Sequence, residues 1–329
     1  MAHPLITTLG SWAADDVTVG EVERALTDLR RHEQQAAVRT GVLTLGCVVP
    51  DQATADQALA TVAELGPRRP ARTLIVITDD DESATGIDAT ASVEVVEIDS
   101  RAVCHELVVL RVRGRARYHV DSIIRPLTLP DLPVFIWVPA EVPTLGDPML
   151  GICDRLLVDT RAVADPEKAL PQVVKLMRQV PVTDLSWVRL APWRQLLSAL
   201  FQGRTNQPFL RGVGHASVAG HFAPRHMMAG WISARIGLAP DAITLEEATH
   251  MAIHLTATAG GRQGEFSVRR PADDRVLVAE VAVESGPSWS QTLRMRDRWP
   301  ARALAEALTR TGADDIYRDA VTTGMRLSP

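Results

Sequence analysis

The 329-residue chain is 46% hydrophobic, enough for two cores, and domains usually divide near this length. Its 35 basic and 40 acidic residues give a net charge of -5, which favours neither nucleic acid nor a membrane surface as a partner. No stretch approaches the roughly 18 uninterrupted apolar residues of a membrane span, and the N-terminus lacks the basic start and apolar core of a secretion signal. We therefore expect a soluble, cytoplasmic protein with two domains.

The cysteine pattern supports the same compartment. Cys47, Cys104 and Cys153 are odd in number and far apart, so they offer neither a disulfide framework nor a CxxC metal or redox motif. A reducing cytoplasm fits this pattern.

Residues 1–165 alternate between apolar strands and amphipathic helices. Thr18 and Glu21 match a capping box that predicts a helix reaching about Arg39. The clearest strand, 134–138, is continuously apolar and closed by prolines on both sides, which is typical of a strand covered on both faces. Further strands are expected at 42–49, 73–77, 93–98, 106–117 and 156–158, and a second helix is expected over 59–65 with Gly66 as its stop. This pattern predicts an α/β domain with a mainly parallel sheet.

Residues 166–329 show a different pattern, typical of an α+β domain with an antiparallel sheet. A helix begins at Asp165-Pro166 or, because of Pro171, about five residues later. The polar, glycine-dotted stretch 203–220 is predicted to be a long loop that is functional or mobile. Helices are expected over 193–200, over 228–235 with Gly237 as its stop, over 301–311 and over 314–321, and strands over 251–257, 265–269, 275–283 and 289–296.

A row of arginines is expected on the strand over 106–117. By the period of two, Arg111, Arg113, Arg115 and Arg117 face away from the apolar side chains of the same strand. Such a row can dock an acidic partner or a phosphate, and it can equally be an exposed face whose charges discourage edge pairing.

Large aromatic residues gather near the middle of the chain. Trp187 and Trp193 lie in the segment 185–201, in a chain with only 4% aromatic residues, and Trp231 lies on a later helix. Large aromatics anchor either a core or an interface.

The usual signatures of catalysis and cofactor binding are missing. There is no GxGxxG after a strand, no GxxxxGK, no HExxH and no GxSxG. The crevice after strand 134–138 carries Glu141 and Asp147 but no reactive pattern. We therefore expect no catalytic, cofactor-binding or metal-binding residues.

Three groups of polar residues are candidates for metal sites. The acidic cluster 79–82 is either a Mg²⁺ site or a solvated turn. His250 and His254 on a strand lie about 13 Å apart, too far to share a zinc ion, and are expected on an exposed face. His215, His221 and His226, in or beside the long loop, have no cysteine or carboxylate at a recognised spacing.

Several segments together resemble a known family. They are Pro70-Ala71-Arg72-Thr73-Leu74-Ile75-Val76, the LPDLPVFIWVPAEVP stretch, Arg155-Leu156-Leu157-Val158-Asp159, the DLSWVRLAPWRQLL segment and Ala229-Gly230-Trp231. In order and spacing, from about residue 20 to 320, the chain resembles the glucose-6-phosphate dehydrogenase assembly protein family, OpcA. The resemblance implies a non-enzymatic partner that promotes the assembly and activity of that dehydrogenase.

Two hypotheses follow. In the first, the protein binds glucose-6-phosphate dehydrogenase and favours one of its conformations or oligomers. In the second, it is an enzyme or sensor for a sugar phosphate or nucleotide, held by Arg68, Arg69 and Arg72 or by the arginine row. The interface expected under the first hypothesis consists of Arg111, Arg113, Arg115, Trp187, Trp193, Arg194 and Trp231.

Overall fold

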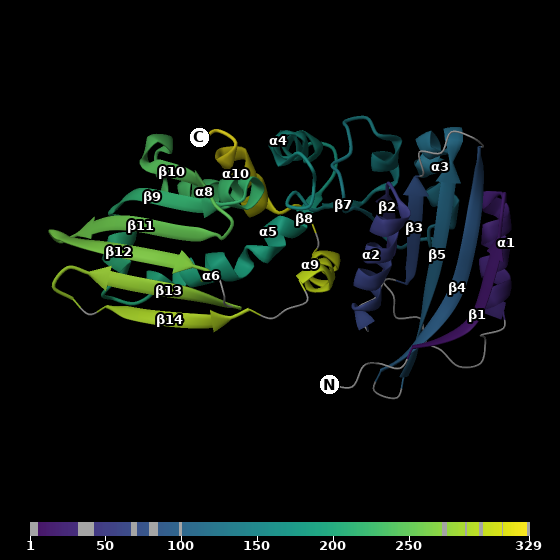
Figure 1. The fold of residues 1–329 in the computed structure, drawn as a ribbon, viewed down its shortest axis with the longest axis horizontal. Coiled ribbons are helices and arrows are strands. Elements are labelled where there is room, and N and C mark those ends of the chain that lie inside the picture. Colours follow the sequence, from purple (N-terminus) through teal and green to yellow (C-terminus); the bar gives the residue numbers. More distant parts are fainter. Residues whose placement is uncertain are drawn as a thin grey trace.

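Two β-sheets lie end to end along the long axis of the molecule, and helices pack against both of them (Figure 1). The computed structural model describes residues 6–31, 43–66, 71–78, 85–98, 101–271, 275–286, 288–295, 299–310 and 312–327. The first sheet is mostly parallel, as expected. The second sheet was expected to be antiparallel and is mixed, because one of its strand pairs is parallel.

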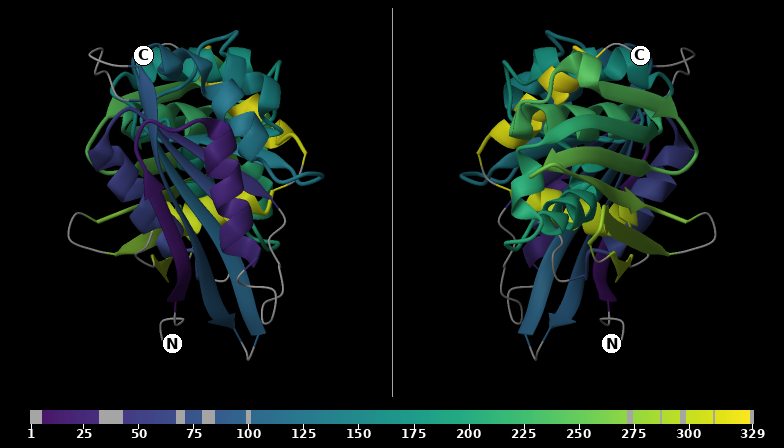
Figure 2. Two further views of the ribbon diagram at one scale, coloured as in Figure 1. Left: turned by 90° about the vertical axis from the view of Figure 1, so that its right-hand side faces the viewer. Right: turned by 90° about the vertical axis from the view of Figure 1, so that its left-hand side faces the viewer.

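The first sheet has eight strands. In chain order they are β1 (Ile6–Ala14), β2 (Thr44–Val49), β3 (Arg72–Thr78), β4 (Gly86–Ile98), β5 (Arg101–Arg113), β6 (Val134–Val138), β7 (Arg155–Val158) and β8 (Val182–Asp184). In space their order is β1-β4-β5-β3-β2-β6-β7-β8. The β1–β4 and β4–β5 pairs are antiparallel, and every other neighbouring pair is parallel. The paired strands β4 and β5 extend past the rest of the sheet, toward the end where the N-terminus lies (Figure 2).

The second sheet has six strands in the order β10-β9-β11-β12-β13-β14. They are β9 (Val213–Gly220), β10 (Ile243–Glu247), β11 (Ala252–Ala259), β12 (Arg262–Arg269), β13 (Val276–Val283) and β14 (Trp289–Arg294). Only the β9–β10 pair is parallel.

The helices divide between the two sheets. They are α1 (Val19–Arg31), α2 (Gln52–Ala63), α3 (Val120–Ile124), α4 (Pro166–Leu176), α5 (Leu185–Arg189), α6 (Ala191–Leu200), α7 (Gln207–Leu210), α8 (Phe222–Ile236), α9 (Trp299–Leu308) and α10 (Asp315–Gly324). On the second sheet, α6 packs against β12 and β13, α8 packs against β9 and β10, and α10 packs on α8. Within the described ranges, none of these helices has both the length and the apolar character needed to cross a bilayer.

Several local predictions are confirmed because their signals are short-range. The Thr18 N–H donates to Glu21 Oε2 (2.8 Å), and the Glu21 N–H donates to Thr18 Oγ1 (3.3 Å), which completes the capping box of α1. Residues 32–39, over which the sequence predicts that this helix continues, lie outside the described part. Asp165 caps α4 by accepting from the Lys168 N–H (3.1 Å), so the earlier of the two expected starts is the one used.

The strand predicted over 106–117 ends earlier than expected. Gly114 adopts a positive φ of 60°, which breaks the extended backbone, and a 3-10 helix follows over Gly114–His119. Arg115 and Arg117 therefore lie on this helix, and the prediction of a single four-arginine strand face is wrong.

The prediction of a long loop over 203–220 is also wrong. This stretch contains α7 and β9, and β9 pairs with both β10 and β11 in the interior of the second sheet. Its buried positions hold only Ala216, Val218 and Gly220, whose small side chains give a weak hydrophobic signal. A strand covered by α8 does not need large side chains, because the helix lies close to it.

The two halves of the chain share their interior. On one face of the first sheet, α2, α5 and α9 enclose a core that joins β2 and β3 to residues 301–308 near the end of the chain. On the other face, a continuous core runs from α1 and α3 through α4 and α8 to the second sheet. β8 and α9 thus belong to the first sheet's layers although both follow residue 165, and the boundary near 165 stays a prediction.

Candidate functional site

A cavity of about 820 Å³ opens at the junction of the two sheets. It lies at the carboxyl ends of β6 and β7, where Trp137, Pro139 and Asp159 line it. In the sheet, β3 lies on one side of β2, whereas β6, β7 and β8 follow one another on its other side. The direction in which successive strands are added therefore reverses between β2 and β6. Ligands of open α/β sheets usually bind at such a reversal.

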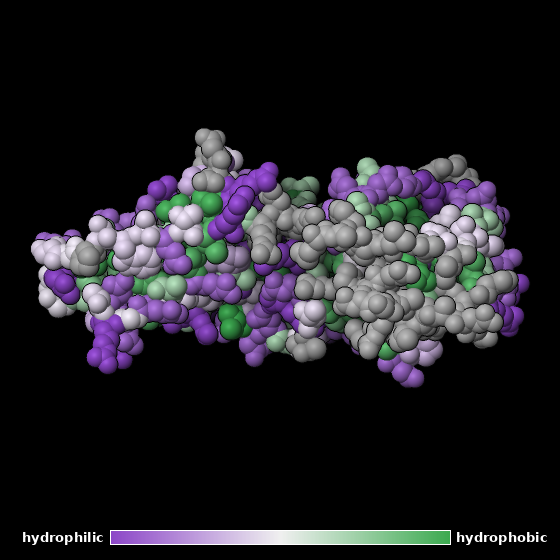
Figure 3. Space-filling model, turned by 90° about the horizontal axis from the view of Figure 1, so that it is seen from below, coloured by the Kyte–Doolittle hydropathy of each residue, from purple (hydrophilic) through white to green (hydrophobic). Residues whose placement is uncertain are grey.

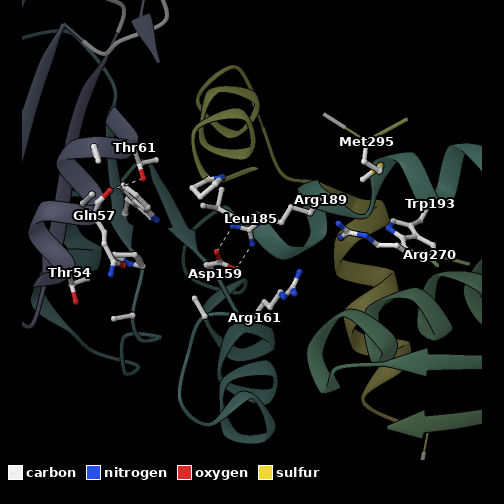
Figure 4. A pocket seen from close by; sticks show the side chains of 17 residues that line it. Thr54, Gln57, Thr61, Asp159, Arg161, Leu185, Arg189, Trp193, Arg270 and Met295 are labelled. Atoms are coloured by element: carbon white, nitrogen blue, oxygen red, sulfur yellow. Dashed lines mark hydrogen bonds and ion pairs between the residues drawn. The ribbon is translucent and has the colours of Figure 1, made fainter. Parts of the chain in front are cut away.

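Arginines from separate elements gather at this junction. Arg161 follows β7, Arg189 ends α5, and Arg270 follows β12 of the second sheet. Arg189 donates from Nη1 and Nη2 to the two carboxylate oxygens of Asp159, each at 2.7 Å. Figure 4 shows Arg161 and Arg270 reaching into the space beside this ion pair from opposite sides. Such forked pairs fix the orientation of both groups.

Arg161 is held by its backbone and not by its side chain. Its N–H donates to Ser186 Oγ (2.8 Å), while its guanidinium has no hydrogen bond or ion pair within the described ranges. Partial burial, with the nearby charges of Arg189 and Arg270, lowers the pKa of Arg161, and Asp159 acts in the opposite direction. The Arg161 side chain is therefore a cation positioned beside other cations.

A buried polar network lies behind the junction. Asp184, fully buried at the end of β8, accepts from Thr160 Oγ1 (2.6 Å), the Ser186 N–H (2.8 Å) and Tyr317 Oη (3.1 Å). Burial, reinforced by the charge of Asp159, raises the pKa of Asp184 to about 6. Ser186 Oγ in turn donates to Asp159 Oδ1 (2.9 Å). The network thereby holds in place Asp159, the carboxylate that lines the cavity.

The crevice after β6 was predicted to be chemically quiet. Asp147 serves there as a helix cap, accepting from the Met149 N–H (3.0 Å), and burial together with Asp147 raises the pKa of Glu141. The charged residues that line the cavity come instead from α5 and from the segments that follow β7 and β12.

The predicted interface aromatics fall into two places. Trp187 is 1% exposed and Trp193 is 6% exposed, so both are core residues in this chain. Trp193 lines the junction cavity, whereas Trp187, Arg194 and the partly buried Trp231 line a separate groove of about 560 Å³. The Arg194 guanidinium stacks 3.6 Å from the Trp187 ring centre, and burial, aided by the charge of Arg310, lowers the pKa of Arg194 to about 10.

The predicted arginine row is divided among local partners. Arg111 Nη2 donates to Gln52 Oε1 (2.6 Å), and Arg113 Nη2 donates to Asp88 Oδ1 (2.8 Å). Arg115 is exposed on the 3-10 helix. Arg72, the arginine of the alternative phosphate site, is buried in an ion pair with Glu106, and Arg68 and Arg69 lie outside the described residues.

The histidines are dispersed. His226 bonds through Nδ1 to the Phe222 carbonyl (2.8 Å), His215 contacts Thr244 Oγ1 (3.0 Å), and His221 precedes α8. His254 lies 3.8 Å from Glu265 on the surface of the second sheet. No group of three or more His, Cys, Asp or Glu side chains among the described residues is arranged to hold a metal, and the acidic cluster 79–82 lies outside them.

Sequence reasoning missed Asp159, Arg161, Arg189 and Arg270 as a group. Asp159 and Arg189 lie within two of the segments that carry the family resemblance, but nothing in their spacing shows that they pair. Arg270 is more than a hundred residues from Arg161, and only the fold brings it to the junction.

Comparison with known proteins covers both halves of the chain. Residues 62–175 match the family model described as the glucose-6-phosphate dehydrogenase subunit N-terminal domain, and residues 180–321 match the corresponding C-terminal domain. This chain is also similar to proteins that carry the name OxPP cycle protein OpcA. In Synechocystis sp. the identity is 28% over 145 residues, 42% of this chain and 30% of that protein.

Two further relatives carry the same name. The protein from Synechococcus elongatus is 28% identical over 187 residues, 55% of this chain and 39% of that protein. The protein from Nostoc punctiforme is 26% identical over 187 residues, 54% of this chain and 40% of that protein. The matched stretch thus spans less than half the length of these relatives. Because the two domain models together account for most of the chain, it belongs to the OpcA family of glucose-6-phosphate dehydrogenase assembly proteins.

Proposed function

We propose that the protein is a non-enzymatic assembly and allosteric activator that binds glucose-6-phosphate dehydrogenase in the cytoplasm and serves the oxidative pentose phosphate pathway. The observation that carries this proposal is the match of both halves to domains described as parts of a subunit of that dehydrogenase. A partner of this kind raises activity only through its greater affinity for the active conformation or oligomer.

The groove beside α6, α8 and α10 supports a protein-binding role. Its rim carries Leu210 and Ile316, which are 39% and 42% exposed, next to Trp231. Large exposed apolar residues around a concave surface are typical of interaction sites. On the lower face of the molecule, the strongly hydrophobic residues that are visible form small patches among hydrophilic ones (Figure 3).

Charge suggests what the groove accepts. Arg194 and Arg235 line it and make no ion pair with a carboxylate of the described residues, although Arg194 donates to the Trp187 carbonyl oxygen (3.0 Å). Arg310 is paired with Glu306 (2.9 Å) and with Asp314 (2.8 Å), which also lines the groove. We therefore propose that a dehydrogenase segment with apolar and acidic side chains docks here, with Trp231 and Arg194 as contacts. Trp187 supports the groove from beneath.

Titration of the protein into the dehydrogenase tests this proposal, with activity and co-elution as readouts. Ile316→Asp should weaken binding at least tenfold, because a carboxylate would have to be desolvated in the apolar groove. Leu145→Asp is the matched control, since Leu145 is 45% exposed on the loop after β6, does not line the groove and should tolerate the same change.

Two results would contradict the proposal. Equal affinity of the Ile316→Asp and Leu145→Asp variants would exclude the groove as the contact surface. Unchanged dehydrogenase kinetics together with no co-elution of the unaltered protein would reject the partnership itself.

The exposed Arg115 is proposed as a second contact, with Arg111 and Arg113 beside it. Arg115→Glu in the same titration should weaken binding without unfolding the chain, because Arg115 is exposed. Arg178, an exposed arginine just after α4, gives the matched control Arg178→Glu.

A further inference from the structure

Arg161, Arg189 and Arg270, which we call the arginine junction, separate two cavities. The 820 Å³ cavity on the α2 side and a smaller one of about 350 Å³ on the α8 side are both lined by these three residues. Trp193 also lines both. The same three arginines therefore contribute to the walls of both cavities.

The charge lining these cavities is strongly unbalanced. The larger cavity is lined by the three arginines and one carboxylate, Asp159, whose two oxygens already accept from Arg189. The smaller cavity adds His221 and His250 to the arginines, and no carboxylate of the described residues lines it. Concave walls with charge of one sign focus the electrostatic potential and concentrate ions of the opposite sign. An anion is the complementary ligand.

The donors suit a phosphate group in particular. The Arg161 guanidinium is not engaged by another side chain of the described chain, and its planar fork matches the oxygens of a phosphate. Burial, together with the charges of Arg189 and Arg270, lowers the pKa of Arg161, and a dianion bound beside these groups would offset that repulsion.

The larger cavity has room and walls for more than a phosphate. Its size lies within the roughly 300–1,000 Å³ typical of ligand pockets. One wall is the face of α2 that carries Thr54, Gln57 and Thr61. Trp137, which is 4% exposed and lines the same cavity, has an indole N–H with no acceptor among the described residues. An unsatisfied buried donor calls for an explanation, and an acceptor on a molecule bound in the cavity would supply one.

We infer that the arginine junction binds the phosphate group of a small phosphorylated metabolite whose remaining part lies along α2 in the larger cavity. This site goes beyond the proposed partnership, because it gives the protein a ligand of its own at the junction of its two sheets. It also differs from the phosphate sites predicted from the sequence, because it is built around the Arg161 guanidinium, whereas the side chains of Arg72, Arg111 and Arg113 bond to other residues.

Calorimetric titration of the isolated full chain tests the site. The probes are inorganic pyrophosphate, glucose 6-phosphate and ADP, with glucose and adenosine as unphosphorylated controls. At least one phosphorylated probe should bind while its control does not. Arg161→Glu should reduce that affinity at least tenfold, because it replaces a donor by a repelling charge, and Arg178→Glu should leave it unchanged.

A second variant separates the two parts of the ligand. Gln57→Glu places a negative charge on the α2 wall, so it should weaken binding of glucose 6-phosphate or ADP more than binding of pyrophosphate. Preference between the sugar phosphate and the nucleotide identifies the class of metabolite. Gln57 and Arg161 are both exposed, so each variant should keep the far-ultraviolet circular dichroism of the unaltered chain.

The inference would be overturned if none of the phosphorylated probes bound at concentrations of several millimolar, or if Arg161→Glu bound them as tightly as the unaltered chain. Both readouts use the protein without the dehydrogenase. A failure here therefore leaves the proposed partnership standing, and a failure of the partnership leaves this site standing.

Discussion

Asp184 illustrates how a single residue ties stability to pH in this chain. Its carboxyl is fully buried at the start of α5, where it also caps the helix by accepting from the Ser186 N–H. Burial raises its pKa from 3.8 to about 6 in the folded chain. The folded state therefore binds more protons than the unfolded state between these values, so the carboxyl's contribution is fully present below 3.8 and is lost as pH rises through about 6.

We expect the free energy of unfolding of the unaltered chain to fall by about 2 kcal/mol, relative to that of Asp184→Asn, between pH 4 and pH 7. Asparagine keeps the shape and the acceptor oxygen but does not ionise, so it isolates this one group. Denaturant unfolding of both proteins at several pH values measures the difference. Parallel pH profiles would show that Asp184 ionises without cost in the folded chain.

At the scale of elements, the contact between α8 and α10 depends on two glycines. A Cβ on Gly230 would meet the Ala320 carbonyl oxygen and the Gly324 backbone, and a Cβ on Gly324 would meet the His226 carbonyl oxygen. The helices thus approach through their backbones, and a backbone atom cannot move aside as a side chain can. This close approach positions α10, whose Tyr317 reaches Asp184.

Gly230→Ala should destabilise the chain by about 3 kcal/mol or more, since the added methyl group forces the two helices apart. Gly20→Ala is the matched control, because Gly20 is also helical but has open space around it. That change should be neutral or stabilise by up to about 1 kcal/mol. Thermal unfolding measures both, and similar effects at the two sites would show that α8 and α10 are not closely packed.

The elements that the sequence predicted well have signals contained within a few residues. The Thr18 capping box, the proline-bounded β6 and the glycine stop of α8, Gly237 at φ 69°, are examples. The two wrong predictions, a loop over 203–220 and a strand reaching residue 117, depend on features that a hydrophobic pattern does not carry. β9 has small side chains because α8 covers it closely, and the end of β5 depends on one backbone angle at Gly114.

At the scale of the whole molecule, the two sheets are joined by shared structure and not by a linker. Arg155 of β7 donates to Thr183 Oγ1 (2.9 Å) and to the carbonyl of Gly312, and α9 packs beside α2 and α5. The arginine junction exists only because of this arrangement. No local pattern around Arg161 or Arg270 predicts that they meet, so the site could not be found from the sequence.

We expect the chain to unfold in denaturant as one cooperative unit. The continuous core between the sheets means that neither half can lose its packing without exposing apolar surface of the other. Tryptophan fluorescence and far-ultraviolet circular dichroism should give coincident transitions. Two separate transitions would support independent domains divided near residue 165.

The position of α9 has a consequence for synthesis on the ribosome. The apolar side chains of β2, β3 and α2 emerge early, but residues 301–308, which complete their cover, are made last. At about 5–20 residues per second, that surface waits roughly ten seconds or longer for its cover. Nascent chains of this protein should therefore be clients of chaperones that shield hydrophobic segments until translation ends.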